Sequence, residues 1–203
     1  MIHRRLSLLA ALVLLLTPAC SWMPRPLITH DPLTSEEHLA LGQAYLAKDL
    51  RPLATNEFQK ALDRDPRNVS AHMELGNLAY EAGALAEAGQ HYRSVLDLDA
   101  RHPGANNNLA MVYLAQGSHL NEIEVLARRA MEGSASFRPY ALHTLASHYF
   151  EQGRHKEAAL LLEEADRLVA GAPPALRFQL AQLRARLEAQ DGPNRSCLSG
   201  LCP

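Results

Sequence analysis

The stretch from Ser35 to Asn68 reads SEEHLALGQAYLAKDLRPLATNEFQKALDRDPRN, and its pattern of small and large apolar residues returns further along the chain. Gly42, for example, is followed by equivalent small residues at spacings of 34, 34 and 36 positions. A repeat with a period near 34 residues predicts a helical solenoid of about four units. The equivalent sets are Gly42, Gly76, Ala110 and Ala146; Ala54, Ala88, Ile123 and Ala158; Phe58, Tyr92, Ala127 and Leu162; and Ala61, Val95, Ala130 and Ala165.

Each unit has the pattern of a helix pair. In the first unit, one group of apolar residues lies at i, i+1 and i+4, and a second group lies at i, i+4 and i+7. Asp65 and Pro66 supply turn chemistry before the next unit begins. The two groups are Leu41, Gly42 and Tyr45, and then Ala54, Phe58 and Ala61.

These units resemble tetratricopeptide repeats, although His38 and His72 stand where the family usually has tryptophan. The resemblance implies an all-α, right-handed solenoid of about four helix-turn-helix units over residues 35–172. The unit bounds lie near 35–68, 69–102, 103–138 and 139–172. It also implies that the first helix of each unit lines a concave groove. The first unit matches best, through Leu41, Gly42, Tyr45, Ala54, Phe58, Ala61 and Pro66.

Residues 1–19 have the pattern of a secretory signal peptide, with a basic start and a short apolar core that is below the roughly 20 residues needed to cross a bilayer. The sequence around Cys20 resembles a bacterial lipoprotein signal, which implies acylation of this cysteine and an outer-membrane lipoprotein facing the periplasm. Ordinary signal cleavage, giving a soluble periplasmic protein, stays open because Thr17 and Pro18 are unusual for lipoproteins. Residues 20–34 then form an extended tether with three prolines.

Two segments follow the repeats. Residues 173–190 carry leucines with the spacing of one helical face, which predicts a capping helix over the end of the solenoid; a partner-binding amphipathic helix is the alternative. Residues 191–203 form a polar, flexible tail in which Cys197 and Cys202 are candidates for a local disulfide in an oxidising compartment. We expect no metal site there, because the tail has no histidine.

The sequence does not have the motifs of an enzyme. It contains no glycine-rich phosphate loop, no nucleophile elbow and no histidine pair at i, i+4. We therefore expect no catalytic residue, no cofactor, no metal and no small-molecule substrate. The formal net charge of −2 identifies no partner by itself.

A binding groove is the expected functional surface. One helical face of each first helix offers amides, aromatics and methionine but no Lys, Arg, Asp or Glu. We therefore expect capture of an uncharged or apolar polypeptide and no binding of nucleic acid. The alternative is that these residues pack between helices or beneath the cap or tether. The candidates are Gln43, Met73, Asn77, Tyr80, Asn107, Met111, His143, Ser147 and Phe150, with Leu39, Leu46 and Leu114 on the same faces.

Two functions fit an anchored groove. The first is a scaffold that assists assembly of an envelope complex such as a pilus or secretin machine, as pilotin lipoproteins of similar architecture do. The second is an adaptor that brings a peptidoglycan hydrolase or protease to its substrate. Both functions need the same anchor and groove, so the residues do not separate them.

Overall fold

The computed structural model describes residues 31–169 and 173–191. The chain divides into two units, Met1–Leu33 and Thr34–Pro203, and the helices of the described residues all lie in the second. The part of the chain that the structure describes contains helices and no strand, so the expected all-α fold is confirmed. The helices are α1 (Ser35–Leu46), α2 (Arg51–Arg64), α3 (Val69–Glu81), α4 (Leu85–Leu98), α5 (Pro103–Gln116), α6 (Leu120–Gly133), α7 (Arg138–Glu151), α8 (His155–Leu168) and α9 (Pro174–Asp191).

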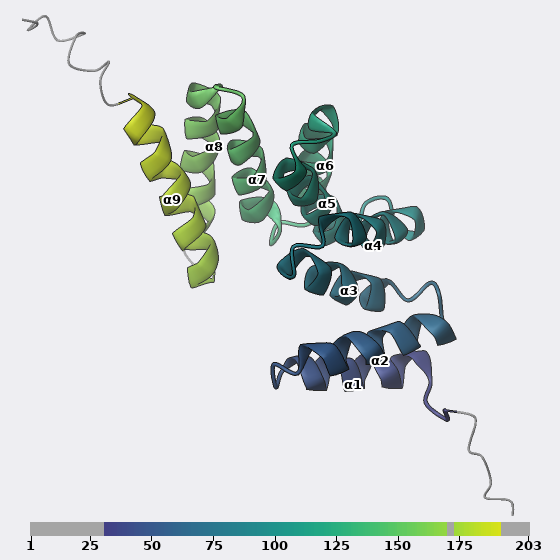
Figure 1. Cartoon of the computed structure of the whole chain (residues 1–203). Helices are drawn as coiled ribbons and strands as arrows, with labels where there is room; N and C mark the ends of the chain where they lie inside the picture. The colour runs from purple at the N-terminus through teal and green to yellow at the C-terminus, as the bar shows by residue number, and fades with distance from the viewer. Residues whose placement is uncertain (1–30, 170–172, 192–203) are drawn as a thin grey trace, which may run out of the picture. The chain divides into compact units, whose positions relative to one another are not determined.

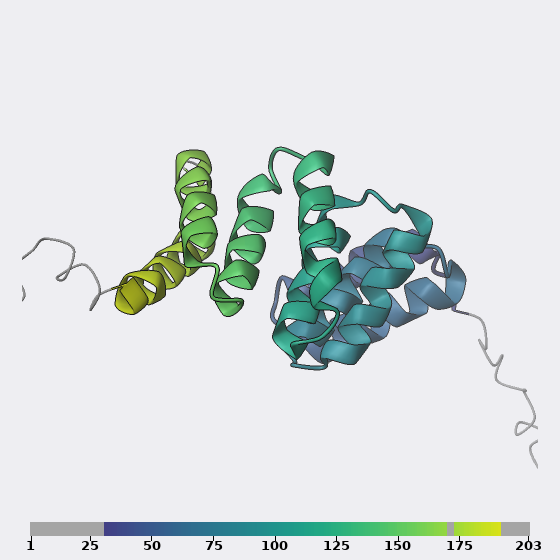
Figure 2. The same ribbon diagram turned by 90° about the horizontal axis from the view of Figure 1, so that it is seen from above.

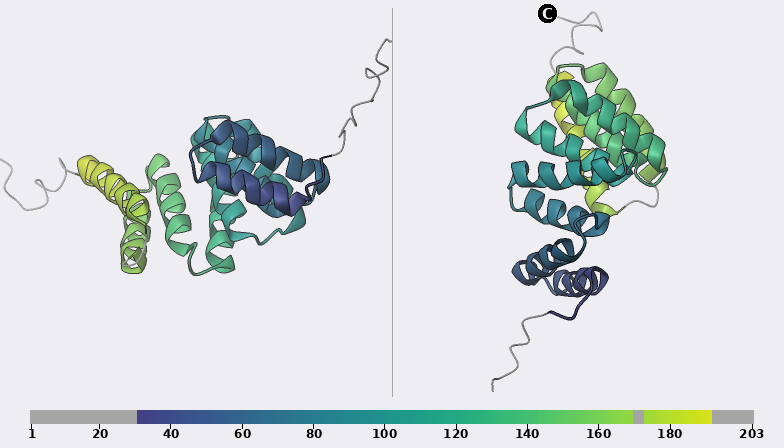
Figure 3. Two further views of the ribbon diagram at one scale, coloured as in Figure 1. Left: turned by 90° about the horizontal axis from the view of Figure 1, so that it is seen from below. Right: turned by 90° about the vertical axis from the view of Figure 1, so that its right-hand side faces the viewer.

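The first eight helices form four antiparallel pairs (Figure 1). Each odd-numbered helix packs along the helix that follows it, and each even-numbered helix then packs on the first helix of the next pair. Figures 2 and 3 show the same succession of pairs from other sides. This is the stacking of a helical solenoid, in which each repeat contacts mainly its neighbours.

The small residues of the repeat are the places where the two helices of a pair come close together. A Cβ atom added at Gly42 would lie 2.4 Å from the ring of Phe58, and one added at Gly76 would lie 2.6 Å from the ring of Tyr92. Both rings are almost fully buried. The aromatic residue of the second helix therefore fills the space that glycine leaves on the first helix, which explains why the two markers recur together.

The turn inside each pair repeats one backbone conformation. Gly83, Gly117 and Gly153 have φ values of 77°, 61° and 74°, a left-handed region in which a side chain is strained. The equivalent residue of the first pair is Asp49, with φ of 56°. Aspartate is among the few residues with side chains that enter this region with some ease, so the first turn keeps the same geometry.

The first helices of the first three pairs begin at side-chain caps. Thr34 and Glu37 form a capping box, in which each side chain bonds the backbone of the other residue. Asn68 accepts from the N–H of Ala71, and the Nδ1 of His102 accepts from the N–H of Ala105. These bonds satisfy N–H groups that have no partner inside the helix, and so they define where the helices start.

Helix α9 packs against α7 and α8 through four leucines. Two ion pairs, between Arg184 and Asp166 and between Arg186 and Glu151, join it to the helices beneath. The four leucines are between 1% and 5% exposed, so α9 covers apolar surface at the end of the described repeats; they are Leu176, Leu180, Leu183 and Leu187.

Three of the candidate residues lie outside the described residues. They are Cys20, proposed for lipidation, and Cys197 and Cys202, proposed for a disulfide. The segment 1–19 and the tail beyond residue 191 lie outside them as well. Among the helices that the structure does describe, none combines the length and the apolar character needed to span a bilayer.

Candidate functional site

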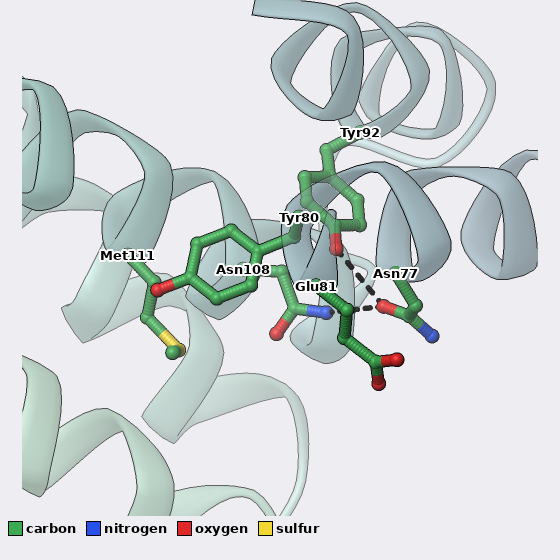
Figure 4. Close-up of a pocket in the computed structure, with 6 residues that line it drawn as sticks. All are labelled: Asn77, Tyr80, Glu81, Tyr92, Asn108 and Met111. Atoms are coloured by element: carbon green, nitrogen blue, oxygen red, sulfur yellow. Dashed lines mark hydrogen bonds between the residues drawn. The ribbon is translucent and has the colours of Figure 1, made fainter. Parts of the chain in front are cut away.

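A pocket of about 150 Å³ lies between α3, α4 and α5 (Figure 4). Three of the expected groove residues line it, namely Asn77 and Tyr80 from α3 and Met111 from α5. The structure adds three residues that the sequence analysis did not single out for the groove: Glu81, Tyr92 and Asn108.

Asn77 is held in place by two hydrogen bonds to its side-chain oxygen. The hydroxyl of Tyr92 donates to this oxygen at 2.9 Å, and the side-chain nitrogen of Asn108 donates to it at 3.0 Å (Figure 4). A carbonyl-type oxygen has two lone pairs, so both are engaged. The NH₂ group of Asn77 is then the part of the amide that has donors to offer a ligand.

Both tyrosines of the pocket keep their hydroxyl protons at neutral pH. Burial raises the pKa of Tyr80 and the pKa of Tyr92 above the ordinary value of 10, because the apolar surroundings disfavour the phenolate. The pocket is therefore lined by neutral phenols, amides and a thioether, with the carboxylate of Glu81 as its charged group. Arg51 of α2 forms an ion pair with Glu81.

A second pocket, of about 300 Å³, adjoins the first. The two pockets share Asn108 and Met111 as lining residues. The second pocket lies between α5, α7 and the start of α9, and its exposed lining is mostly apolar. We call the two pockets together the groove. The remaining residues of the second pocket are Asn107, Phe137, Tyr140, His143, Thr144, Pro173, Ala175, Leu176 and Gln179.

Asn107 differs from the expected free amide. Its side chain is 2% exposed, and the hydroxyl of Thr144 donates to its oxygen at 3.0 Å. Its nitrogen lies 3.4 Å from the side-chain oxygen of Asn108 and 3.5 Å from the sulfur of Met111. Asn107 thus links α5 to α7 beneath the groove, and Asn108 takes the accessible position beside it.

Phe150 is also covered. Its side chain is 9% exposed, and the guanidinium of Arg186 on α9 lies 4.4 Å from the ring centre, a cation–π arrangement. His155 packs edge-on against the same ring. The alternative interpretation, packing beneath the cap, therefore describes Phe150 better than an open groove does.

The other candidates lie around the groove or beyond it. Gln43 is exposed on α1, with its nitrogen 3.4 Å from a carboxylate oxygen of Glu74, and Met73 and Ser147 are half-buried. His143 is half-buried in the lining of the second pocket, and burial lowers its pKa below 6.5. The structure thus gathers Asn77, Tyr80, Met111 and His143 around the groove, and Asn107 contributes to the lining of the second pocket although it is almost fully buried.

Two signals in the sequence point to the missed residues. Glu81 lies four residues after Asn77 and so continues the same helical face, while Asn108 directly follows a candidate. Tyr92 stands at the position that Phe58 takes in the first unit, where the expected role was packing. Its hydroxyl, which Phe58 lacks, is what brings it into the pocket.

Comparison with known proteins agrees with this fold. The tetratricopeptide-repeat family matches residues 39–103. A solved structure of MamA superposes with a TM-score of 0.61 at 20% identity, covering 70% of this chain and 81% of that one. A tetratricopeptide-repeat protein of Thermus thermophilus superposes with a TM-score of 0.63 at 19% identity, covering 75% and 82%. Residues 39–103 thus match tetratricopeptide repeats, and the described helices have the fold of solved proteins of this kind.

One curated relative has an enzyme's name. The probable biofilm formation methyltransferase WspC of Pseudomonas putida is 30% identical over 115 residues, which make up 53% of this chain. The chain spans 27% of the length of that relative. At the level of class, the fold is that of a scaffold for protein–protein interaction, whose partners are proteins or peptides.

Proposed function

We propose that this protein is a lipid-anchored periplasmic scaffold that captures an uncharged or apolar polypeptide segment in its groove and assists assembly of an envelope complex such as a pilus or secretin machine. The observation that carries the proposal is the adjoining pair of pockets on α3, α5 and α7, which share Asn108 and Met111. First helices of three successive units contribute to one lining, as expected for a surface that holds an extended segment.

The chemistry of the groove suits a peptide backbone next to apolar side chains. The NH₂ group of Asn77 donates to a backbone carbonyl, since the oxygen of the amide is already engaged. Tyr80, Met111 and Tyr140 offer aromatic and thioether surface to the side chains of the segment. The amide fixes the position of the segment, and the apolar contacts supply most of the binding free energy.

The charge of the groove argues against phosphate-bearing partners. Binding of nucleic acid depends on several Lys or Arg side chains that neutralise phosphates. The lining of the two pockets contains Glu81 and contains neither Lys nor Arg. An uncharged or weakly basic segment therefore fits better than an acidic one.

The proposal assigns no reaction to the protein. Around the two pockets, the described hydrogen bonds join amides, hydroxyls and a thioether, and none of them joins a histidine or a carboxylate to a Ser or Thr nucleophile. The likeness to WspC covers 27% of that protein, so the activity in its name is not carried over to this chain.

Capture is tested by photo-crosslinking in cells. A photoreactive amino acid is installed at Tyr80 and, as a matched control, at Asp97, an exposed residue of α4 that lines neither pocket. We expect a discrete protein adduct from position 80 and none from position 97, and mass spectrometry of the adduct then names the partner. Equal adducts from both positions, or none from position 80, contradict capture in the groove.

The anchor is tested separately. In cells labelled with an alkyne analogue of palmitate, we expect the wild-type protein to carry the label and to sediment with outer membranes. The Cys20→Ser variant should lose the label and appear in the soluble periplasmic fraction, because the thiol that accepts the lipid is absent. A wild-type protein that is exported but unlabelled would overturn the lipid anchor and leave capture in the groove unaffected.

A further inference from the structure

Two histidines that are far apart in the sequence face each other inside the second repeat. His72 on α3 and His91 on α4 have their Nδ1 atoms 3.1 Å apart. Their ring centres are 5.4 Å apart, and the ring planes meet at 48°. Both side chains are half-buried, so the pair lies near the surface between the two helices of one unit and remains accessible to small solutes.

The repeat itself creates this arrangement. The equivalent residues of the first unit, 34 positions earlier, are His38 and Glu57, and there the Nδ1 of His38 lies 2.7 Å from a carboxylate oxygen of Glu57. In both units the Nδ1 of the histidine on the first helix thus faces the equivalent side chain of the second helix. In the first unit that side chain is a carboxylate, whereas in the second it is another imidazole.

The tautomer of His72 is set by the backbone. Its Nε2 lies 3.1 Å from the carbonyl oxygen of Pro66, which only accepts hydrogen bonds, so Nε2 carries the proton. In the neutral ring, Nδ1 then has a free lone pair that points toward His91. A histidine whose other ring nitrogen donates to a backbone carbonyl is the usual arrangement of a metal ligand, because that bond fixes the ring and makes the ligating nitrogen more basic.

We propose that His72 and His91 bind a divalent transition-metal ion through their two Nδ1 atoms. Histidine nitrogens lie about 2.0–2.1 Å from Zn²⁺, which places two ligands about 3.3 Å apart at the tetrahedral angle and about 2.9 Å apart at a right angle. The observed 3.1 Å falls between these values. Both rings must rotate so that their lone pairs turn away from the line between the two nitrogens and toward a common point.

The proton balance of this step is simple. Without metal, the Nδ1 of His91 carries the hydrogen that lies between the two rings. When the ion binds, that hydrogen leaves Nδ1, and solvent supplies one to the Nε2 of the same ring, so His91 changes tautomer and stays neutral. Two neutral imidazoles are the ligand set that suits zinc, copper and nickel.

Water completes the coordination of the ion. The described residues contain no group of three or more His, Cys, Asp or Glu side chains placed to hold a metal ion. Glu87 lies one helical turn before His91 on α4, but it is not placed to complete a set of three protein ligands. A site with two protein imidazoles and solvent has moderate affinity and exchanges its metal.

The bound ion would join α3 to α4. These helices carry Asn77, Tyr80 and Tyr92 of the smaller pocket. A ligand that binds the folded state and not the unfolded chain raises thermal stability. The inference does not depend on the proposed function, because the pair is a site of its own.

The test uses zinc chloride and a parent protein with the substitutions Cys20→Ser, Cys197→Ser and Cys202→Ser, so that thiols do not compete for the metal. The parent protein has no affinity tag. Isothermal titration calorimetry should give one Zn²⁺ per chain, with a rise in Tm measured by circular dichroism. In this background, His72→Gln and His91→Ala should each weaken binding at least tenfold. The control His119→Gln changes an exposed histidine of another unit and should leave the affinity unchanged.

A second readout guards against variants that do not fold. Electron paramagnetic resonance of the parent protein with one equivalent of CuCl₂ should show coupling to two imidazole nitrogens, and His91→Ala should reduce this to one. Absence of Zn²⁺ binding at millimolar concentration, or equal affinity in the His72 and His91 variants and the parent, would overturn the proposal. So would a copper spectrum that the His91 substitution leaves unchanged.

Discussion

Tyr92 takes part in the core and in the groove at the same time. Its ring is 1% exposed and fills the space above Gly76, while its hydroxyl donates to Asn77 in the smaller pocket. A substitution at Gly76 therefore affects both the packing of α3 on α4 and the position of the Asn77 amide in the groove.

Exchange of this glycine for alanine tests the close approach. In Gly76→Ala the new methyl group would lie 2.6 Å from a buried ring that has little room to move, so we expect a loss of about 1–3 kcal/mol in the free energy of unfolding. Urea denaturation followed by circular dichroism measures it.

Gly89→Ala is the matched control on the facing helix. A Cβ at Gly89 would have its nearest neighbour at 3.5 Å, an ordinary contact, and alanine favours helix over glycine by about 1 kcal/mol. We expect this variant to be as stable as the wild type or more stable. Equal effects of the two substitutions would contradict the packing described for Gly76.

At the scale of the element, α9 covers apolar surface of α7 and α8. Its four leucines lie in the same apolar cluster as Leu142, Leu162 and Phe150 of α7 and α8. Arg186 places its guanidinium over Phe150, so one side chain of α9 both forms an ion pair and covers an aromatic ring. This helix covers the end of the described repeats, and its first residues line the second pocket.

Two substitutions on α9 separate its faces. Leu183 is 3% exposed and Phe178 is 64% exposed. Leu183→Ala should lower the free energy of unfolding by about 2–5 kcal/mol, because it leaves a cavity in the core. Phe178→Ala removes more atoms, yet it should cost about 0.5 kcal/mol or less because the ring already faces solvent. Thermal melts of both variants check this order, and its reversal would mean that α9 packs through its other face.

At the scale of the whole molecule, several histidines are linked to stability. Burial lowers the pKa of His91, of His143 and of His148 below the ordinary value of 6.5, because the charged ring is poorly solvated in the folded chain. In the unfolded chain these rings bind protons at a higher pH than they do in the folded chain. The folded state is therefore not penalised by these rings above pH 6.5. The free energy of unfolding decreases as the pH falls from 6.5 toward the lowered pKa values, because the unfolded chain then binds more protons.

We expect the free energy of unfolding to decrease when the pH is lowered from 7.5 to 5. Burial raises the pKa of Glu57, but hydrogen bonds from Lys60 and His38 outweigh this effect and lower the pKa overall. Glu57 should therefore add to the loss of stability only below pH 4.5. Urea denaturation at several pH values measures the slope. His143→Gln should make it shallower and His119→Gln, at an exposed site, should not; an unchanged slope in both would contradict the role of burial.

The repeated pattern in the sequence determined the architecture of this protein. Gly42 with Phe58 and Gly76 with Tyr92 recur because two helices meet closely at these points, and the left-handed turn recurs at residues 49, 83, 117 and 153 for a similar local reason. Such constraints act within one unit and return with its period. The all-α repeat fold was therefore predictable, as were the helical faces on which the groove was sought.

Only the tertiary structure decided which side chains are accessible and which of them meet. Asn107 and Phe150 lie on the expected faces, but Thr144 engages the first and Arg186 covers the second. The opposition of His72 and His91 depends on the packing of α3 on α4 in the same way. Helical periodicity fixes the direction of a side chain about its own axis, whereas its neighbours are set by how helices from different parts of the chain pack together.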